Sequence, residues 1–241
     1  MSSTLVAVTL DAHDPVGLAS FWGSLLDRQV VHEASGALLP ADHTQVGLRF
    51  VAASTERSGR NRLHLHLTST SPEDQQRTVA TALGLGGRHL DVGQLPEEDH
   101  VVLGDPEGNE FCVIEAGNAF LAGCGLLGEV SCEGSREVGL FWRDALDWSL
   151  VWDRDEETAV QSPAGGTKLS WGGPPVSPKR ARNRQRFDLA AADPRQEVAR
   201  LVAVGAKRLG DRGGSIELAD PDGNEFCVTR VGEETVRHRD R

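Results

Sequence analysis

Apolar and polar residues alternate in some stretches of the chain and recur at helical spacing in others. Residues 5–11 (LVAVTLD) alternate and are rich in β-branched side chains, which predicts a strand. Residues 14–27 then open with Asp-Pro and place apolar residues three and four positions apart, which predicts an amphipathic helix. Strands are expected near 28–33, 36–40 and 45–52.

The same order of elements returns further along the chain. A strand at 62–68 precedes a helix at 71–83, and strands are expected near 88–91, 100–104 and 110–115. Asp105-Pro106-Glu107-Gly108-Asn109 predicts a tight turn between the last two strands, because proline presets φ while glycine and asparagine tolerate positive φ. Each such series forms one βαβββ module.

The chain also repeats itself. DPEGNEFCV begins at Asp105 and DPDGNEFCV at Asp220. In the same order, ASFWGSLLD (19–27) aligns with GLFWRDALD (139–147), and NRLHLHL (61–67) aligns with NRQRFDL (183–189). We therefore predict two homologous domains of two modules each, at 1–117 and 118–232, followed by a charged C-terminal tail at 233–241.

Composition narrows the class of protein. With 39% apolar and 25% charged residues in 241, the chain has globular composition. A formal net charge of −11 argues against nucleic acid as a partner, and no apolar run is long enough for a membrane span. The N-terminus has no basic region followed by an apolar core, so no secretory signal is expected, and the four cysteines form no C-x-x-C pair. We expect a cytoplasmic monomer or homodimer that binds a small-molecule ligand.

The strand–helix opening from Leu5 to Trp22, the NRLHLHL strand and both DPxGNEFCV endings resemble the glyoxalase/bleomycin-resistance family, also called the vicinal oxygen chelate superfamily. The resemblance covers both halves and points to the glyoxalase-like branch. It implies an α+β fold of two tandem glyoxalase-like domains, each with two βαβββ modules whose curled mixed sheets enclose a cleft. Whether modules pair within one half, between halves or between chains stays open.

Many members of that family hold a divalent metal on the first and last strands of their modules. The resemblance places these positions on Ala7, Leu48 or Arg49, His64 and Cys112, and in the second half on Leu127, Ser170, Arg186 and Cys227. Alanine and leucine offer no ligand atom, and arginine repels a dication, so no metal cofactor is expected there. A rearranged zinc site made of His64, His66 and Cys112 is the alternative.

Strand alternation indicates which side chains face a cleft. In residues 62–67 the leucines share one face, which we expect to pack on helices, while the basic residues share the other. If modules pair within halves, the first cleft holds Thr9, Asp11, Arg49, Arg62, His64, His66 and Cys112. The second then holds Glu129, Ser131, Lys168, Ser170, Arg184, Arg186 and Asp188.

These residues support more than one chemistry. His64 or His66 can act as general base or acid in a metal-independent lyase or isomerase, with Cys112 either a nucleophile or an inert packing residue. Arg184 and Arg186 suit a carboxylate or phosphate, or else form an ion network with nearby acids. The alternatives are a sequestering protein like the bleomycin-resistance members and a metal-dependent glyoxalase or dioxygenase.

One segment of the second half fits none of the predicted elements. Trp171-Gly-Gly-Pro-Pro and the basic run at 179–182 are interpreted as a solvated loop, with a cleft cover as the alternative.

Overall fold

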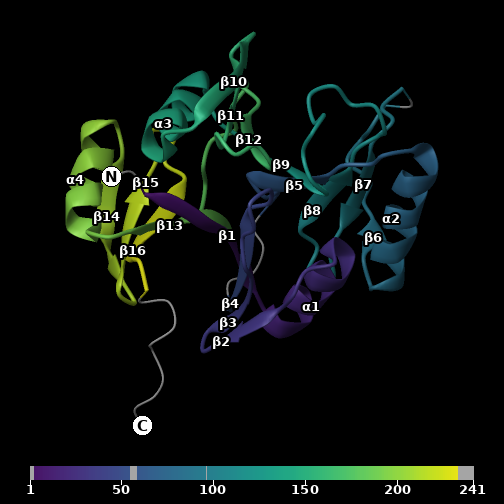
Figure 1. Ribbon diagram of the computed structural model, residues 1–241, viewed down its shortest axis with the longest axis horizontal. Helices are drawn as coiled ribbons and strands as arrows, with labels where there is room; N and C mark the ends of the chain where they lie inside the picture. Colours follow the sequence, from purple (N-terminus) through teal and green to yellow (C-terminus); the bar gives the residue numbers. More distant parts are fainter. Residues whose placement is uncertain (1–2, 55–58, 96, 233–241) are drawn as a thin grey trace.

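The structure is a computed structural model, and it describes residues 3–54, 59–95 and 97–232 (Figure 1). The predicted charged tail at 233–241 lies outside the described residues. Four βαβββ modules follow one another along the chain, so the predicted order of elements is confirmed. None of the described helices is long and apolar enough to span a membrane.

The first half contains two modules. The first consists of β1 (Thr4–Ala12), α1 (Pro15–Leu26), β2 (Val31–Glu33), β3 (Gly36–Leu39) and β4 (Gly47–Ala52). The second consists of β5 (Leu63–Leu67), α2 (Pro72–Gly84), β6 (Arg88–His89), β7 (Val101–Gly104) and β8 (Glu110–Val113).

The second half repeats this order. The third module consists of β9 (Leu127–Cys132), α3 (Arg136–Leu146), β10 (Ser149–Arg154), β11 (Glu157–Gln161) and β12 (Lys168–Trp171). The fourth consists of β13 (Gln185–Ala191), α4 (Pro194–Ala203), β14 (Lys207–Arg212), β15 (Ser215–Ala219) and β16 (Glu225–Arg230).

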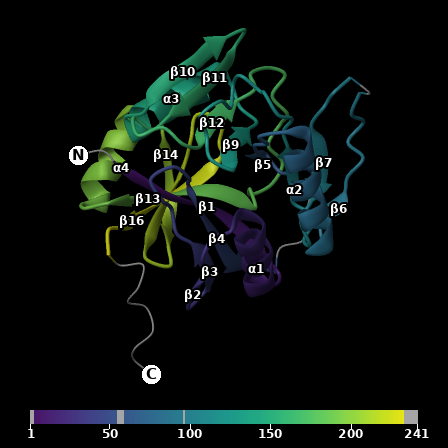
Figure 2. The same cartoon turned by 45° about the vertical axis from the view of Figure 1, so that its right-hand side comes forward.

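The modules pair between the halves of the chain. The first sheet has the order β14-β15-β16-β13-β1-β4-β3-β2 and joins the fourth module to the first. The second sheet has the order β10-β11-β12-β9-β5-β8-β7-β6 and joins the third module to the second. Antiparallel pairs β1–β13 and β5–β9 form the two seams (Figures 1 and 2). Each sheet therefore contains one module from each half.

The aromatic clusters, unlike the sheets, join modules of the same half. Helix α1 lies against β3 and β4 of the first sheet, but its Trp22 ring packs at 4.9 Å from Phe111 of β8 in the second sheet. In the second half, α3 lies against β11, and its Trp142 ring packs at 4.9 Å from Phe226 of β16. The sheets thus join the two halves, while these aromatic clusters hold together the two modules of each half.

The repeated turn connects this packing to the strands. Asp105 is fully buried; its carboxylate accepts a hydrogen bond from the Trp22 indole at 3.2 Å and one from the backbone N–H of Asn109 at 2.9 Å. Asp220 does the same for the Trp142 indole at 3.4 Å and the Asn224 backbone at 2.9 Å. The nonapeptide recurs because each half needs this buried acceptor between its helix and its last hairpin.

The interpretation of Trp171 as a loop residue is wrong. Trp171 is the last residue of β12, where it pairs with Cys132 of β9 and Thr158 of β11, and it is only 1% exposed. A large aromatic side chain on a central strand is buried for its apolar surface, and the adjacent glycines and prolines concealed this in the sequence. The loop proper begins at Gly172.

Candidate functional site

Pairing between halves regroups the predicted cleft residues. The grouping by halves is wrong, because β1 and β5 lie in different sheets. The first sheet brings together Thr9, Asp11, Arg49, Arg186 and Asp188. The second sheet brings together His64, His66, Cys112, Glu129, Ser131, Lys168 and Ser170. Arg62 and Arg184 lie just before β5 and β13, outside both groups.

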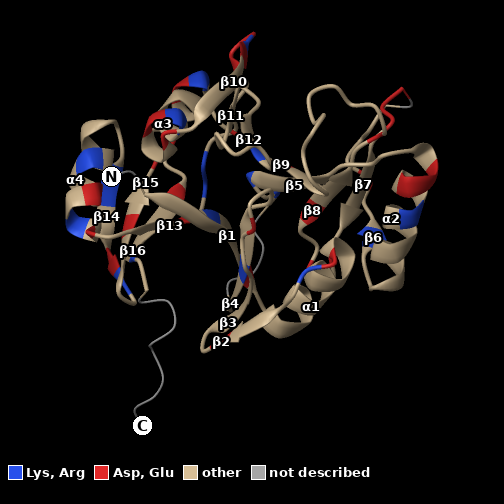
Figure 3. Ribbon diagram, in the orientation of Figure 1, with Lys and Arg blue, Asp and Glu red and all other residues tan. Residues whose placement is uncertain are grey.

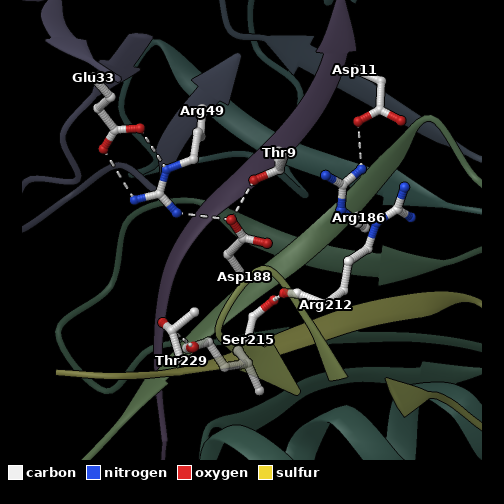
Figure 4. Close-up of polar contacts among 10 residues, drawn as sticks. Thr9, Asp11, Glu33, Arg49, Arg186, Asp188, Arg212, Ser215 and Thr229 are labelled. Carbon is white, nitrogen blue, oxygen red and sulfur yellow. Dashed lines mark hydrogen bonds and ion pairs between the residues drawn. The ribbon is translucent and has the colours of Figure 1, made fainter. Parts of the chain in front are cut away.

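On the first sheet, the predicted polar residues bind one another (Figure 4). Arg49 lies between two carboxylates, with Nη1 at 2.8 Å from Asp188 Oδ2 and Nε at 3.0 Å from Glu33 Oε2. The Thr9 hydroxyl donates to the same Asp188 oxygen. Asp188 therefore receives a charged and a neutral donor across the seam between the halves.

A second ion pair lies beside this cluster. Arg186 Nη1 lies 2.6 Å from Asp11 Oδ1, and both side chains are about nine-tenths buried, at 12% and 11% exposed. Burial acts to lower the pKa of Arg186, but the charge and hydrogen bond of Asp11 raise it above its ordinary value. Buried ion pairs of this kind are costly to break and add little net stability over apolar packing. The first-sheet cluster is an ion network that joins the halves, and within the described residues its one buried donor without a partner is Nε of Arg186.

On the second sheet, a chain of hydrogen bonds joins the halves around His66. We call His66, Cys112, Glu129 and Ser170 the His66 site. His66 pairs in register with Glu129 across the seam and with Cys112 of β8. Its Nδ1 lies 2.7 Å from Glu129 Oε2, and the Ser170 hydroxyl donates to the other oxygen of Glu129.

The His66 site carries a charged imidazole. Burial acts to lower the pKa of His66, but hydrogen bonds with Cys112 and Glu129 and the charge of Glu129 raise it to about 10. Burial acts to raise the pKa of Glu129, but the hydrogen bond and charge of His66 lower it. At neutral pH, His66 is therefore an imidazolium paired with a carboxylate, and this does not favour a role as general base.

His64 has the opposite charge state. Burial and the neighbouring charge of His66 lower the pKa of His64 to about 4, so its imidazole is neutral at pH 7. Its Nε2 is buried and has no hydrogen-bond partner within the part of the chain that the structure describes. His64 and His66 thus share one face of β5, as predicted, but offer different chemistry.

The cysteines of the two sheets differ in exposure. Cys112 is half-buried and hydrogen-bonds His66, whereas its repeat equivalent Cys227 is 8% exposed. Burial, then the charge of Asp188, raises the pKa of the Cys227 thiol. A packing role therefore suits Cys227, while Cys112 belongs to the hydrogen-bonded residues of the His66 site.

A cavity of about 330 Å³ opens beside the His66 site. Glu129 and Ser170 form part of its wall, so the carboxylate lies between the cavity and His66. Its apolar wall includes Phe120 and Trp152, whose rings meet edge to face with centroids 5.8 Å apart. We call it the aromatic cavity; its lining is Phe120, Glu129, Ser131, Trp152, Glu157, Thr158, Ser170, Trp171 and Gly172.

Sequence reasoning proposed Glu129, Ser131 and Ser170 of the polar wall but missed Glu157, Thr158 and the aromatic wall. Phe120 lies in the segment between β8 and β9, where no periodicity indicates its direction. Trp152 lies on β10, whose exposed and half-buried residues carry no strong strand pattern. The only signal was the aromatic type itself, since large rings on open strands are enriched at binding sites.

The residues at the family's metal positions do not suit a metal ion. Ala7, Leu48 and Leu127 are fully buried apolar side chains. Within residues 3–54, 59–95 and 97–232, no group of three or more His, Cys, Asp or Glu side chains is arranged to hold a metal ion. The zinc alternative at His64, His66 and Cys112 has no such arrangement to support it.

Four βαβββ modules in two eight-stranded sheets define a protein of two tandem glyoxalase-like domains. A family model described as "Glyoxalase-like domain" matches residues 7–114 and 129–229, so the chain belongs to the glyoxalase-like domain family. A search of curated proteins gives no significant match.

Solved structures agree with the fold. Glyoxalase I from Zea mays is similar with a TM-score of 0.67 at 13% identity, covering 95% of this chain and 92% of that one. A putative dioxygenase from Bacillus subtilis subsp. subtilis str. 168 is similar with a TM-score of 0.59 at 13% identity, covering 97% of this chain and 88% of that one. At such identities the likeness shows the fold, and function has to be argued from the site.

Proposed function

We propose that this protein binds a small organic molecule in the aromatic cavity of the second sheet. The observation that carries the proposal is the placement of the Glu129 carboxylate in an aromatic-walled cavity of about 330 Å³, which lies in the range of small-molecule sites. The partner is a small molecule; the first-sheet cluster contributes no group to this cavity.

The lining indicates the kind of ligand. Phe120 and Trp152 bring aromatic rings to the wall. Lys168 lies over the first ring and Arg154 over the second, so the ring surface left to a flat apolar group excludes those two faces. The polar wall consists of carboxylate and hydroxyl groups, which favour a hydrogen-bond donor on the ligand. A small aromatic molecule with at least one N–H or O–H group fits both walls.

Tryptophan fluorescence tests the binding proposal. The chain has five tryptophans and no tyrosine, and Trp152 and Trp171 line the cavity. A panel of phenols, catechols and anilines is titrated while the emission is recorded. We expect a saturable change for some of them and an affinity roughly tenfold lower in Trp152→Ala, since truncating a buried aromatic anchor costs on the order of 1–2 kcal/mol.

Trp148→Phe is the matched control, because Trp148 packs against the core and does not line the cavity. This variant is expected to bind every compound like the wild type. Equal losses in Trp148→Phe and Trp152→Ala would rule out the aromatic cavity as the binding site.

A proton-transfer enzyme is the second candidate. It is supported by the hydrogen-bonded chain in which Glu129 faces the cavity while His66 and Ser170 hold its two oxygens. Glu129 would accept a proton from a C–H group next to a carbonyl, and His66, behind the carboxylate, would hold it in place through Nδ1. In this candidate, His66 is a positioning residue that holds the Glu129 carboxylate, and Glu129 takes the role of base that the sequence suggested for His66.

Exchange of the activated proton of 2-hydroxyacetophenone with D₂O, followed by NMR, separates the two candidates. A proton-transfer enzyme exchanges it, and Glu129→Gln loses exchange while it keeps binding. A sequestering protein binds the compound without exchange above the buffer rate. Exchange that is unchanged in Glu129→Gln would contradict the assignment of Glu129 as the acceptor.

A further inference from the structure

A second cavity, of about 430 Å³, lies where the two halves meet at the starts of β5 and β13. It shares no lining residue with the aromatic cavity. Its cationic lining residues are Arg60, Arg62, Lys179, Arg180, Arg182 and Arg184. Among the described residues that line it, Glu133 is the one carboxylate. We call it the basic pocket.

The concentration of positive charge is unusual for this chain. The protein has 25 Lys and Arg against 36 Asp and Glu, with a net charge of −11, yet one pocket gathers six of the cations. Figure 3 shows Lys and Arg along the segment that leads from β12 to β13. Like charges repel at these separations, so such a cluster needs counter-charges or a ligand.

Two arginines that line the pocket are equivalent in the repeat. Arg62 and Arg184 occupy the same position of the repeat, and each reaches the turn of the other half. Arg62 Nε donates to Asn224 Oδ1 at 2.8 Å, and Arg184 Nη2 lies 3.5 Å from Glu107 Oε2. Arg184 is 9% exposed, and its Nε is buried without a hydrogen-bond partner among the described residues. A buried donor left without a partner is costly.

Carboxylates balance part of the charge, beginning with Glu133 of the lining, which lies 3.5 Å from Arg62. Lys179 pairs with Glu225 at 2.6 Å, and Arg182 pairs with Glu217. Arg180 is exposed and has no ion pair or side-chain hydrogen bond with any other residue that the structure describes. The pocket therefore keeps an excess of guanidinium groups on a wall that faces solvent.

We propose that the basic pocket binds the phosphate groups of a small anionic molecule. Guanidinium forks from several directions match the tetrahedral oxygens of phosphate, and the volume accepts more than one such group. The site is independent of the aromatic cavity, and it gives a role to the basic run at 179–182 that the sequence presented only as a loop or a cover.

Isothermal titration calorimetry with pyrophosphate tests the proposal on the full chain. We expect saturable one-site binding, weaker binding of inorganic phosphate, and a marked loss of affinity on raising the NaCl concentration. Arg180→Ala is expected to weaken pyrophosphate binding roughly tenfold, the cost of one charge-assisted hydrogen bond, without changing the melting temperature.

Arg77→Ala is the matched control, since Arg77 is an exposed arginine on α2 that does not line the pocket. It should bind pyrophosphate like the wild type. Absence of saturable binding, equal losses in Arg77→Ala and Arg180→Ala, or tighter binding of succinate than of pyrophosphate would each overturn the proposal. The binding of phenols or catechols is not measured in this test. A negative result for the basic pocket therefore leaves the proposal for the aromatic cavity unaffected, and the reverse also holds.

Discussion

His64 and His66 lie two residues apart on one face of β5, yet at pH 7 the first is neutral and the second is charged. The pKa of His64 is lowered to about 4 and that of His66 is raised to about 10. The difference comes from the third module, because Glu129 of β9 faces His66 while Ser131 faces His64. A contact between the halves of the chain thus determines the charge of the candidate site.

Removing His66 should change how stability depends on pH. The folded-state pKa is about 10 against an ordinary value of 6.5, so the stabilisation by the His66–Glu129 pair is fully present below pH 6.5 and is lost as the pH rises through 10. We expect the difference in unfolding free energy between wild type and His66→Gln to shrink by about 2–4 kcal/mol between pH 6.5 and 10. Urea denaturation at several pH values measures it, and a constant difference would contradict the charged pair.

His64 should show the opposite dependence. Its folded-state pKa is about 4, below the ordinary value of 6.5, so between these values the unfolded chain binds a proton at His64 and the folded chain does not. The contribution of neutral His64 to the free energy of unfolding is therefore fully present above pH 6.5 and is lost as the pH falls through 4. We expect His64→Gln to lose less stability than wild type between pH 6.5 and 4, by about 2–3 kcal/mol. The same denaturation series checks this, and an unfolding free energy that falls equally in both proteins between pH 6.5 and 4 would refute it.

The buried aspartate of the repeated turn should matter for stability. Asp220 accepts hydrogen bonds from the Trp142 indole and the backbone of Asn224, and its burial raises its pKa to about 6. Asp220→Ala leaves these donors buried without an acceptor, so we expect a loss of about 2–3 kcal/mol in unfolding free energy. Asp211→Ala, an exposed aspartate, should change it by less than about 0.5 kcal/mol. Similar losses in both variants would contradict the structural role of the turn.

A substitution in the first-sheet ion cluster should lower stability without changing the affinity for ligands of the aromatic cavity. Asp188→Ala removes the acceptor of Thr9 and one partner of Arg49, so we expect a loss of about 3 kcal/mol in unfolding free energy. At a temperature where the variant stays folded, its affinity for compounds in the aromatic cavity should match wild type. Calorimetry and the fluorescence titration measure the two quantities. Lost affinity with unchanged stability would place the ligand on the first sheet instead.

Much of the fold could be predicted from local patterns. The alternation of residues 63–67 predicted which side chains share a face, and their buried leucines confirm it. The Asp-Pro start of α1 and the turn at Asp105 also follow from local chemistry, with the Asp14 side chain accepting from the Gly17 backbone.

The partner of each module could not be predicted. Strands β1 and β5 carry the same kind of alternation, and pairing within or between halves satisfies it equally well. Only the long-range pairing of β1 with β13 and of β5 with β9 separates the two arrangements. The His66–Glu129 contact was missed for that reason, although both residues were proposed to face a cleft.

The central claim is that the His66 site is built jointly by both halves, with His66 of one half charged by Glu129 of the other. NMR of ¹³C-labelled histidines in wild type, His66→Gln and Glu129→Gln tests it most directly, the second protein serving to assign the signal. We predict that His66 stays protonated in wild type until about pH 10 and that Glu129→Gln lowers its pKa by at least about one unit. A His66 signal that titrates near 6.5, unchanged in Glu129→Gln, would contradict the account.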